Sequence, residues 1–360
     1  MKRLRIRSMF IGLSIAALCS SAMAVNTMPN CGVVVGSGMP DVDITTAMTP
    51  LAGSNQSFIG AQIQAPVQNT NGTGQARFPI KLVGETQNDI VVYPNIQNAT
   101  HTHYFWGNVK SALYARTNPA NLRLDCLSEA AGGVENCSGY WSPVVVNTLL
   151  DAILHASDLS AYYKSGGAPS VFDEPIQPVP VGFRMITGDA AASTPVPNNN
   201  NPSLIRYSCL QANGVWTINP ATNQKFFPNI PQCGVGGEVH VMIQFPNCWD
   251  GVNSDTPNHK AHVAFKGTGL FCPATHPVRI PQIAYNYSIP VETLSGTASW
   301  RLSSDNYPVN GYNAGYSLHA DWVNGWRPET MQTFISECLN RARDCHSQNL
   351  GDGTRLLPVS

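Results

Sequence analysis

The chain has 360 residues, of which 43% are hydrophobic and only 12% are charged, and its formal net charge is −1. The hydrophobic share is enough to build a sizeable core, whereas the charged share is about half of what soluble domains usually carry. A nearly neutral chain without basic clusters lacks the electrostatic footprint of a protein that binds nucleic acid or an anionic membrane, so we expect neither partner.

The first 24 residues have the pattern of a secretory signal. Basic residues crowd the first seven positions, an apolar run follows from Met9 to Cys19, and Ala22-Met23-Ala24 forms a small-x-small cleavage site. The apolar run is shorter than the about 20 residues that a membrane-spanning helix needs, and no later stretch is apolar enough. We therefore expect cleavage near Ala24 and a mature chain that is secreted, to the periplasm or the extracellular space, and does not span a membrane.

Cysteine usage agrees with export. Ten cysteines are present, and Cys19 would leave with the signal. In an oxidising compartment the remainder should be mostly paired, because no Cys-x-x-Cys spacing suggests a zinc-thiolate site. Sequence alone does not determine connectivity, but pairing between neighbours is the simplest hypothesis and leaves Cys31 free. The expected bonds are Cys126–Cys137, Cys209–Cys233, Cys248–Cys272 and Cys338–Cys345.

Domain organisation follows from composition. Residues 25–76 are rich in small and polar residues and predict an N-terminal leader that is partly disordered. Residues 77–353 alternate short β-rich runs with proline and glycine turns, which is typical of one β-rich domain. Residues 354–360 are expected to form a tail.

The first chemical motif is HTHYFWGN at 101–108. In a strand, His101 and His103 point to the same face, and two imidazoles at that spacing can chelate one metal ion, with copper or zinc the best match. The alternative is that both rings bond to backbone groups and position the loop before Gly107. Further along, Tyr140 and Trp141 either pack in the core, which is commoner for large aromatic residues, or offer a stacking face.

The segment from Cys248 to Pro281 concentrates acids and histidines among prolines and glycines. A long irregular loop of this kind is usually functional when it is ordered. We predict His276 as a third metal ligand beside His101 and His103. The catalytic candidates in this loop are Asp250, Asp255, His259 and His262. The alternative is a loop braced by turn-capping aspartates and by histidines that bond to carbonyl groups.

Near the C-terminus, His319 and Asp321 are two residues apart and share a face if extended. They complete the catalytic candidates, because a carboxylate can orient an imidazole that acts as ligand or base, although it can equally satisfy a buried histidine. PETMQTFISECLNRARDC then predicts the one clear helix, with Pro328 in its first turn. Its apolar stripe is expected to face the core: Met331, Phe334, Ile335, Cys338, Leu339 and Ala342.

Several of these motifs together resemble a known family. CWDG at 248–251, the acid and histidines after it, and CPATHPVRIP at 272–281 match, as do HTHYFWGN, SGYWSPV at 138–144 and HADWVNGW at 319–326. The chain is similar over roughly Phe78 to Gly353 to exported fungal and bacterial proteins catalogued as a domain of unknown function, family nineteen-ninety-six (DUF1996). The resemblance implies relatedness but no reaction.

The many short strands predict a mainly β fold, a β-sandwich or jelly roll in a single domain with a C-terminal helix and long irregular loops. No P-loop, dinucleotide fingerprint or Gly-x-Ser-x-Gly elbow occurs. The leading hypothesis is an extracellular metal-centred enzyme acting on polysaccharide or cell-surface material. The alternatives are a non-catalytic carbohydrate- or surface-binding protein and a disulfide-braced structural protein. The binding alternative would use as stacking platforms Trp106, Trp141, Trp322 and Trp326.

Overall fold

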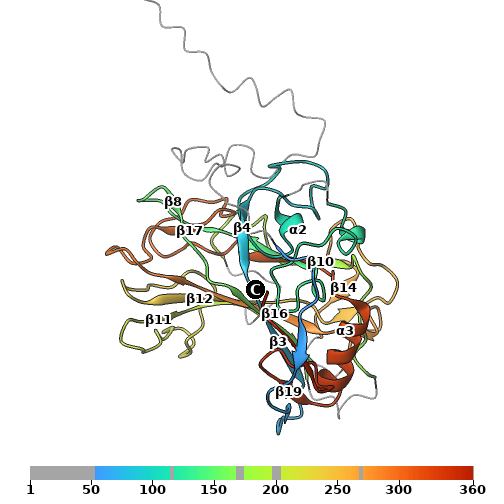
Figure 1. Cartoon of the computed structure of the whole chain (residues 1–360). Helices are drawn as coiled ribbons and strands as arrows, with labels where there is room; N and C mark the ends of the chain where they lie inside the picture. The colour runs from blue at the N-terminus through green and yellow to red at the C-terminus, as the bar shows by residue number, and fades with distance from the viewer. Residues whose placement is uncertain (1–52, 114–116, 168–173, 197–203, 267–270, 360) are drawn as a thin grey trace, which may run out of the picture.

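The computed structural model describes residues 53–113, 117–167, 174–196, 204–266 and 271–359. Within them the chain is mainly β, as predicted, and its two largest sheets have five and seven strands (Figure 1). The expected signal segment, Cys31 and most of the expected leader lie outside the described residues. None of the helices in the described part of the chain has the length and apolar character that a membrane span needs.

The five-stranded sheet is antiparallel throughout. Its strands in spatial order are β10 (Arg184–Gly188), β18 (His319–Val323), β6 (Gly139–Pro143), β5 (His103–Gly107) and β4 (Leu82–Thr86). The three central strands β18, β6 and β5 are buried along their whole length, which is why their sequences read as nearly continuous apolar and aromatic runs.

The seven-stranded sheet joins segments from both ends of the described chain. Its spatial order is β11 (Ile205–Leu210), β12 (Glu238–Gln244), β16 (Gln282–Pro290), β9 (Leu159–Lys164), β3 (Gln75–Ile80), β19 (Arg343–Cys345) and β2 (Val67–Gln68). All pairs in it are antiparallel except β19 with β3. On β12 the exposure alternates strictly, with Val239, Val241 and Ile243 turned to the core.

Aromatic side chains join the two sheets into a sandwich-like arrangement. Tyr104 and Trp106 of β5 lie 6.1 and 4.9 Å from the ring of Tyr287 on β16, measured between centroids. Tyr140 of β6 lies 5.7 Å from Tyr285. All these rings are nearly or fully buried and belong to one hydrophobic core between the sheets.

Alternation along the strands gives the five-stranded sheet a second, outer face. Phe105 pairs across to Trp141, Trp141 pairs to Asp321, and Asp321 pairs to Ile186, so these four side chains form one row on that face. The row packs under a smaller apolar cluster that includes Ile90, Val91, Val109 and Leu122 from the connections around it.

Smaller elements complete the fold. One small sheet holds β14 (Val263–Ala264), β13 (Cys248–Trp249) and β15 (Val278–Arg279), and another holds β17 (Trp300–Leu302), β7 (Val145–Asn147) and β8 (Ala152–Ile153). A third pairs β1 (Ile59–Ala61) with β20 (Thr354–Leu356), so pieces expected in the leader and in the tail form structure with each other. Two short helical segments are α2 (Val109–Leu113) and η2 (Pro119–Asn121).

The predicted C-terminal helix is present as α3 (Pro328–Phe334), which continues into a π-helical turn, η4 (Ile335–Leu339). Its apolar stripe is buried at Met331, Phe334 and Ile335, as expected for a core face. The helical segment ends before Cys345, and this allows Cys338 and Cys345 to bond.

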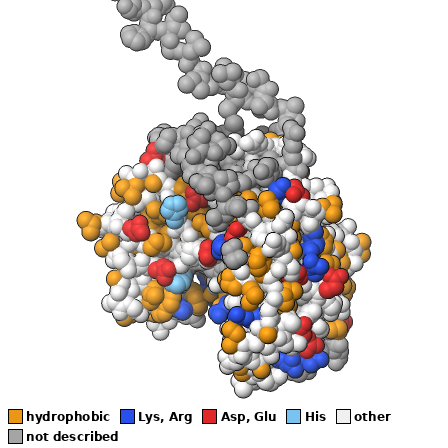
Figure 2. All heavy atoms as spheres, in the orientation of Figure 1, with side chains coloured by type: hydrophobic (Ala, Val, Ile, Leu, Met, Phe, Trp, Pro, Cys, Tyr) orange, Lys and Arg blue, Asp and Glu red, His pale blue; other side chains and the backbone are white. Residues whose placement is uncertain are grey.

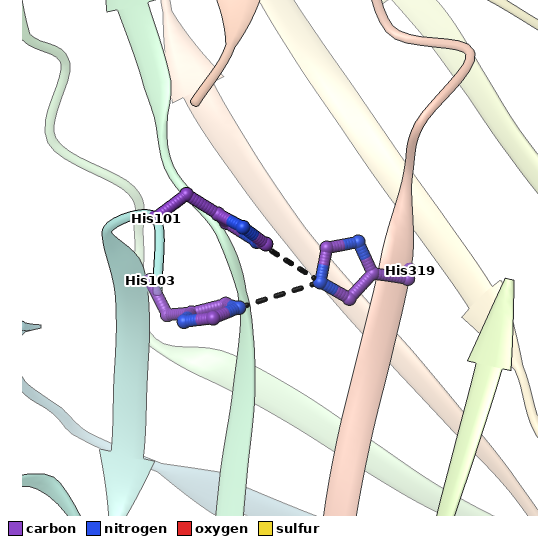
Figure 3. Close-up of side chains that lie close together, drawn as sticks. All are labelled: His101, His103 and His319. Carbon is purple, nitrogen blue, oxygen red and sulfur yellow. Dashed lines mark hydrogen bonds between the residues drawn. The ribbon is translucent and has the colours of Figure 1, made fainter. Parts of the chain in front are cut away.

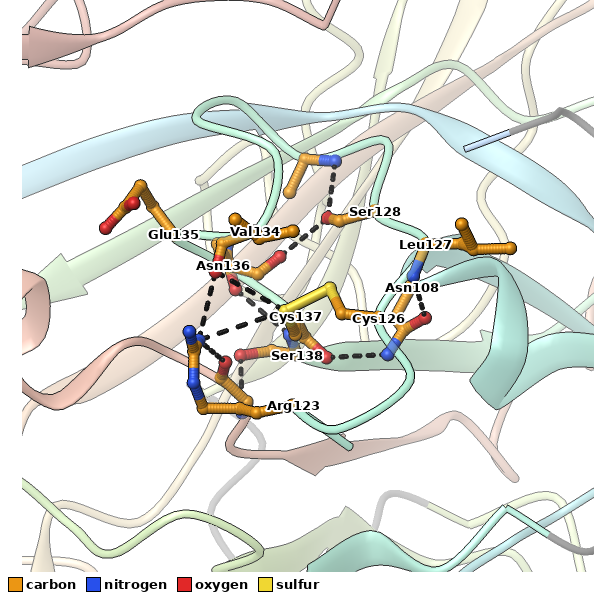
Figure 4. The surroundings of a disulfide bond; sticks show 12 residues. Asn108, Arg123, Cys126, Leu127, Ser128, Val134, Glu135, Asn136, Cys137 and Ser138 are labelled. Atoms are coloured by element: carbon orange, nitrogen blue, oxygen red, sulfur yellow. Dashed lines mark hydrogen bonds between the residues drawn. A yellow bond between two sulfur atoms is a disulfide. The ribbon is translucent and has the colours of Figure 1, made fainter. Parts of the chain in front are cut away.

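All four disulfides predicted from neighbour pairing are confirmed. Figure 4 shows how Cys126–Cys137 is embedded: Asn108 Nδ2 donates to the Cys137 carbonyl at 3.0 Å. Arg123 Nη1 donates to the carbonyls of Val134 at 3.0 Å and Gly325 at 2.9 Å. A disulfide typically raises the free energy of unfolding by about 2–4 kcal/mol, chiefly by restricting the unfolded chain.

The surface agrees with the low charge content, because Figure 2 shows charged side chains scattered among uncharged polar and apolar ones on the face in view. The tryptophans that were considered as stacking platforms cannot serve that role, because they are at most 1% exposed: Trp106, Trp141, Trp322 and Trp326. The expectation that Tyr140 and Trp141 pack in the core is confirmed.

Candidate metal centre

Three histidines meet on the outer face of the five-stranded sheet. His103 begins β5, His101 lies two residues before it, and His319 begins β18. His319 Nε2 lies 3.2 Å from His101 Nε2 and 3.3 Å from His103 Nε2 (Figure 3). Strands β5 and β18 are separated by β6, so their backbones are about 10 Å apart and the rings reach towards each other across it.

The hydrogen bonds of His319 determine which of its nitrogens is available. Its Nδ1 lies 2.8 Å from the carbonyl oxygen of Ser317, so Nδ1 carries the proton and donates it to that carbonyl. The lone pair of Nε2 then points at His101 and His103. A backbone carbonyl that fixes the tautomer in this way is the usual support of a metal-binding imidazole.

Burial keeps all three rings neutral. Desolvation lowers the pKa of His101 and His103 well below the ordinary value, and the neighbouring imidazoles lower both further. Desolvation lowers the pKa of His319 to about 4. Neutral imidazole is the form that binds a metal ion, so the site needs no deprotonation at neutral pH.

Two carboxylates lie beside His103. The ligand atoms that Asp89, His103 and Asp321 offer are all within 4.8 Å of one another, and the three residues are at most 4% exposed. Among the described residues, neither carboxylate oxygen of Asp321 has a hydrogen-bond partner, nor does His103 Nδ1. Desolvation, with the negative charge of Asp89, raises the pKa of Asp321 well above its ordinary value.

Asp89 was missed in the sequence. It follows β4, and its Oδ1 accepts hydrogen bonds from the backbone nitrogens of Val91 and Val92, both at 2.9 Å. The only local signal is an aspartate that opens a turn after a strand, and this pattern is far commoner in ordinary turns than in metal sites.

The loop from Asp255 to His262 is anchored on β10, the strand next to β18. Asp255 bonds to Arg184 Nε at 2.6 Å and to His259 Nδ1 at 2.8 Å. His262 Nε2 donates to the Arg184 carbonyl at 2.9 Å. Lys260 Nζ donates to the Gly188 carbonyl at 2.7 Å, and its positive charge helps to lower the pKa of His319.

The other candidates from the central segment lie apart from the three histidines. Asp250 Oδ1 accepts from the backbone nitrogens of Val252 and Asn253 at 2.8 and 2.9 Å, as the turn-capping alternative describes. His276 bonds through Nε2 to the Ala261 carbonyl at 3.0 Å. Of the predicted site residues, the structure therefore brings together His101, His103, His319 and Asp321, but not His276.

Comparison with known proteins gives one match. The family model described as a domain of unknown function (DUF1996) matches residues 89–326, which is more than half of the chain. That range contains Asp89, all three clustered histidines and Asp321. No curated protein and no solved structure matches.

Proposed function

Since this chain belongs to the DUF1996 family, whose description names no reaction, we propose a function from its geometry: the protein binds a zinc or copper ion through His101, His103 and His319. The observation that carries the proposal is the convergence of three imidazole Nε2 atoms, two of them within 3.3 Å of the third. Imidazole is a ligand that suits both metals.

The donor set favours a catalytic metal over a structural one. Structural zinc sites are usually closed by four protein ligands, whereas catalytic sites have three protein ligands and an open position. Three histidines supply the ligands here, and His101 is only half-buried while the other two are buried. A metal held in this way would polarise a substrate oxygen or lower the pKa of a bound water.

The setting of the site suits an exported enzyme. The four disulfides fit an oxidising compartment, and the N-terminal sequence has a secretory pattern. Polysaccharide or cell-surface material is the substrate class that we propose. Asp321 and the Asp255–His259 pair are the acid–base candidates, while Asp250 and His262 support the loop.

Metal analysis of the purified chain tests the proposal. We expect bound zinc or copper in the wild type, and the loss of at least one equivalent in the His101→Ala and His319→Ala variants. His276→Ala is the matched control, because the ring of this histidine bonds to the Thr275 hydroxyl and the Ala261 carbonyl in its own loop, and the variant should keep the wild-type metal content. A wild type that binds neither metal at micromolar free concentrations rules the proposal out.

A second candidate function is non-catalytic binding of an acidic polysaccharide. A groove of about 390 Å³ lies on the outer face of the seven-stranded sheet. Lys225 Nζ sits 3.9 Å from the Trp216 ring centroid, and Arg206 Cζ sits 3.6 Å from that of Phe226. Because the cations cover these aromatic faces, a neutral sugar cannot stack on them. The positive charges favour an anionic sugar instead.

A glycan array with the wild type and an Arg206→Ala, Lys225→Ala double variant tests this candidate. Binding of uronic-acid or sulfated glycans that the double variant loses would support it. An array without any bound acidic glycan would remove it.

A further inference from the structure

We propose that Asp89, Asp321 and His103 form a second cation subsite, so that the centre binds two divalent cations that share the His103 ring. The proposal rests on the proposed function, because His103 is also a ligand of the first metal ion. It goes further by assigning two acidic ligands and a bridge, which turn a mononuclear site into a dinuclear one.

The first argument is the unmet bonding capacity of Asp321. The residue is 1% exposed, and both of its carboxylate oxygens lack a hydrogen-bond partner in the part of the chain that the structure describes. An unpaired buried carboxylate is costly, and proteins seldom retain one unless an ion or a proton compensates it. The ligand atoms of Asp89 and His103 lie within 4.8 Å of that of Asp321, so one cation could contact all three residues.

The second argument is the geometry of His103. The two nitrogens of an imidazole ring point in nearly opposite directions, and Nε2 is turned towards His319 at 3.3 Å (Figure 3). Nδ1 of this fully buried residue has no hydrogen-bond partner within residues 53–359 as far as they are described. In the proposed centre Nδ1 binds the cation held by Asp89 and Asp321, and Nε2 binds the cation held by the other two histidines. When both cations bind, the ring N–H proton is released to solvent and the ring bridges them as an imidazolate.

The third argument is charge. The turn that holds Asp89 through Val91 and Val92 fixes its carboxylate beside Asp321. Two carboxylates offset the charge of one divalent cation. The positive charge of Lys260 lowers the pKa of Asp321, but its ammonium group donates its hydrogen bond to the Gly188 carbonyl and not to the Asp321 carboxylate. Mixed carboxylate and imidazole ligands suit first-row divalent ions such as Zn²⁺ and Mn²⁺.

Zinc stoichiometry of the metal-stripped full chain is the decisive measurement, by equilibrium dialysis followed by elemental analysis. The wild type should bind about two equivalents, as in other two-metal centres. Asp321→Asn and Asp89→Asn should each bind about one, because the three histidines remain, and His101→Ala should also bind about one, because the second subsite remains. His103→Ala should lose both ions.

Asp344→Asn is the matched control, because Asp344 pairs at 3.8 Å with His346, two residues away, with the same spacing as Asp321 and His319. It should bind as much zinc as the wild type. Circular dichroism and the melting temperature establish that each variant is folded. With cobalt(II) in both subsites, the bridge should couple the two spins and reduce the electron paramagnetic resonance signal per ion, and Asp321→Asn should restore it.

The outcomes separate this proposal from the previous one. One zinc in both the wild type and Asp321→Asn overturns the second subsite and leaves the three-histidine site in place. One zinc in the wild type and none in Asp321→Asn makes Asp321 a ligand of a single centre, which also overturns the second subsite. No zinc in the wild type overturns both proposals.

Discussion

Two buried aspartates in the C-terminal part of the chain, Asp305 and Asp321, are equally inaccessible at 1% exposure but have opposite surroundings. Neither carboxylate oxygen of Asp321 has a hydrogen-bond partner among the residues that the structure describes. Asp305 accepts five hydrogen bonds of 2.7–3.3 Å, from the backbone nitrogens of Leu302, Gly315 and Ser317 and from the hydroxyls of Tyr307 and Ser317.

The difference teaches how to separate a structural acid from a functional one. Asp305 organises residues 302–317, because its carboxylate replaces the water that five donors would otherwise need. Within the described residues the side chain of Asp321 accepts no hydrogen bond, and it lies instead beside a second acid, Asp89, and His103. A buried carboxylate without a donor calls for a specific explanation, and a bound cation is one of the few that apply.

The largest expected effect is on the structural side of the comparison. Asp305→Ala removes the acceptor of five buried hydrogen bonds and should lower the free energy of unfolding by about 3–5 kcal/mol. Urea denaturation measures this loss. Asp125→Ala is the control, because the Asp125 side chain is 75% exposed and its pair with Lys110 contributes at most about 1 kcal/mol. A loss below about 1 kcal/mol for Asp305→Ala would contradict the structural role.

On the functional side, metal should stabilise the fold. Zinc at a free concentration of 100 times its dissociation constant should raise the free energy of unfolding by about 2.7 kcal/mol for each site, because it binds only the folded chain. The shift in melting temperature with added zinc measures the effect. His319→Ala should abolish the part of the shift that comes from the three-histidine site, and His276→Ala should retain the whole shift. Equal shifts in these two variants would place the metal elsewhere.

Asp321→Asn should change the free energy of unfolding in the opposite direction to Asp305→Ala. In the metal-free protein near pH 7 it should stabilise the fold by about 1–2 kcal/mol, because it removes an unpaired buried carboxylate. The folded pKa of Asp321 is raised, so its favourable contribution is complete below the unfolded pKa and is lost as pH rises through the folded pKa. The advantage of the variant should therefore vanish below about pH 4 and grow with increasing pH.

Thermal and urea unfolding of the metal-free wild type and Asp321→Asn between acidic and neutral pH provide the check. A variant that is less stable than the wild type at neutral pH would show that Asp321 has a structural role like that of Asp305.

The smallest effect concerns His319. Its pKa is lowered from 6.5 to about 4 by burial, so it contributes stability above the unfolded pKa that is lost as pH falls towards the folded pKa. Between pH 6.5 and about pH 5.5 the metal-free wild type should lose about 1 kcal/mol more than His319→Gln does. Urea denaturation at the two pH values gives the change in the free energy of unfolding with pH for each protein. Equal changes in the wild type and in His319→Gln would show that the pKa of His319 is not lowered by folding.

Much of the fold could be predicted from local patterns. Cysteines close in sequence paired with each other, since a short loop brings its ends together at little cost in entropy. The stripe from Met331 to Leu339 predicted a helix with a core face, because helical periodicity places those residues on one side. The His-x-Asp spacing predicted a shared face correctly, because side chains alternate along β18. His101 lies in a bend before β5, and its ring is 4.3 Å from that of His103, measured between centroids.

The sequence by itself therefore determined the fold class and the two half-sites around His103 and His319, and it favoured the disulfide pairs, because each depends on neighbours along the chain. Only the tertiary structure decided that these half-sites meet, that Asp89 joins them and that His276 lies elsewhere. It also decided that the candidate tryptophans are buried. These outcomes depend on the order β18-β6-β5 and on the packing of connections over the sheet. Strand order and register arise from contacts between segments more than 200 residues apart, as between His103 and His319, and no local periodicity encodes such contacts.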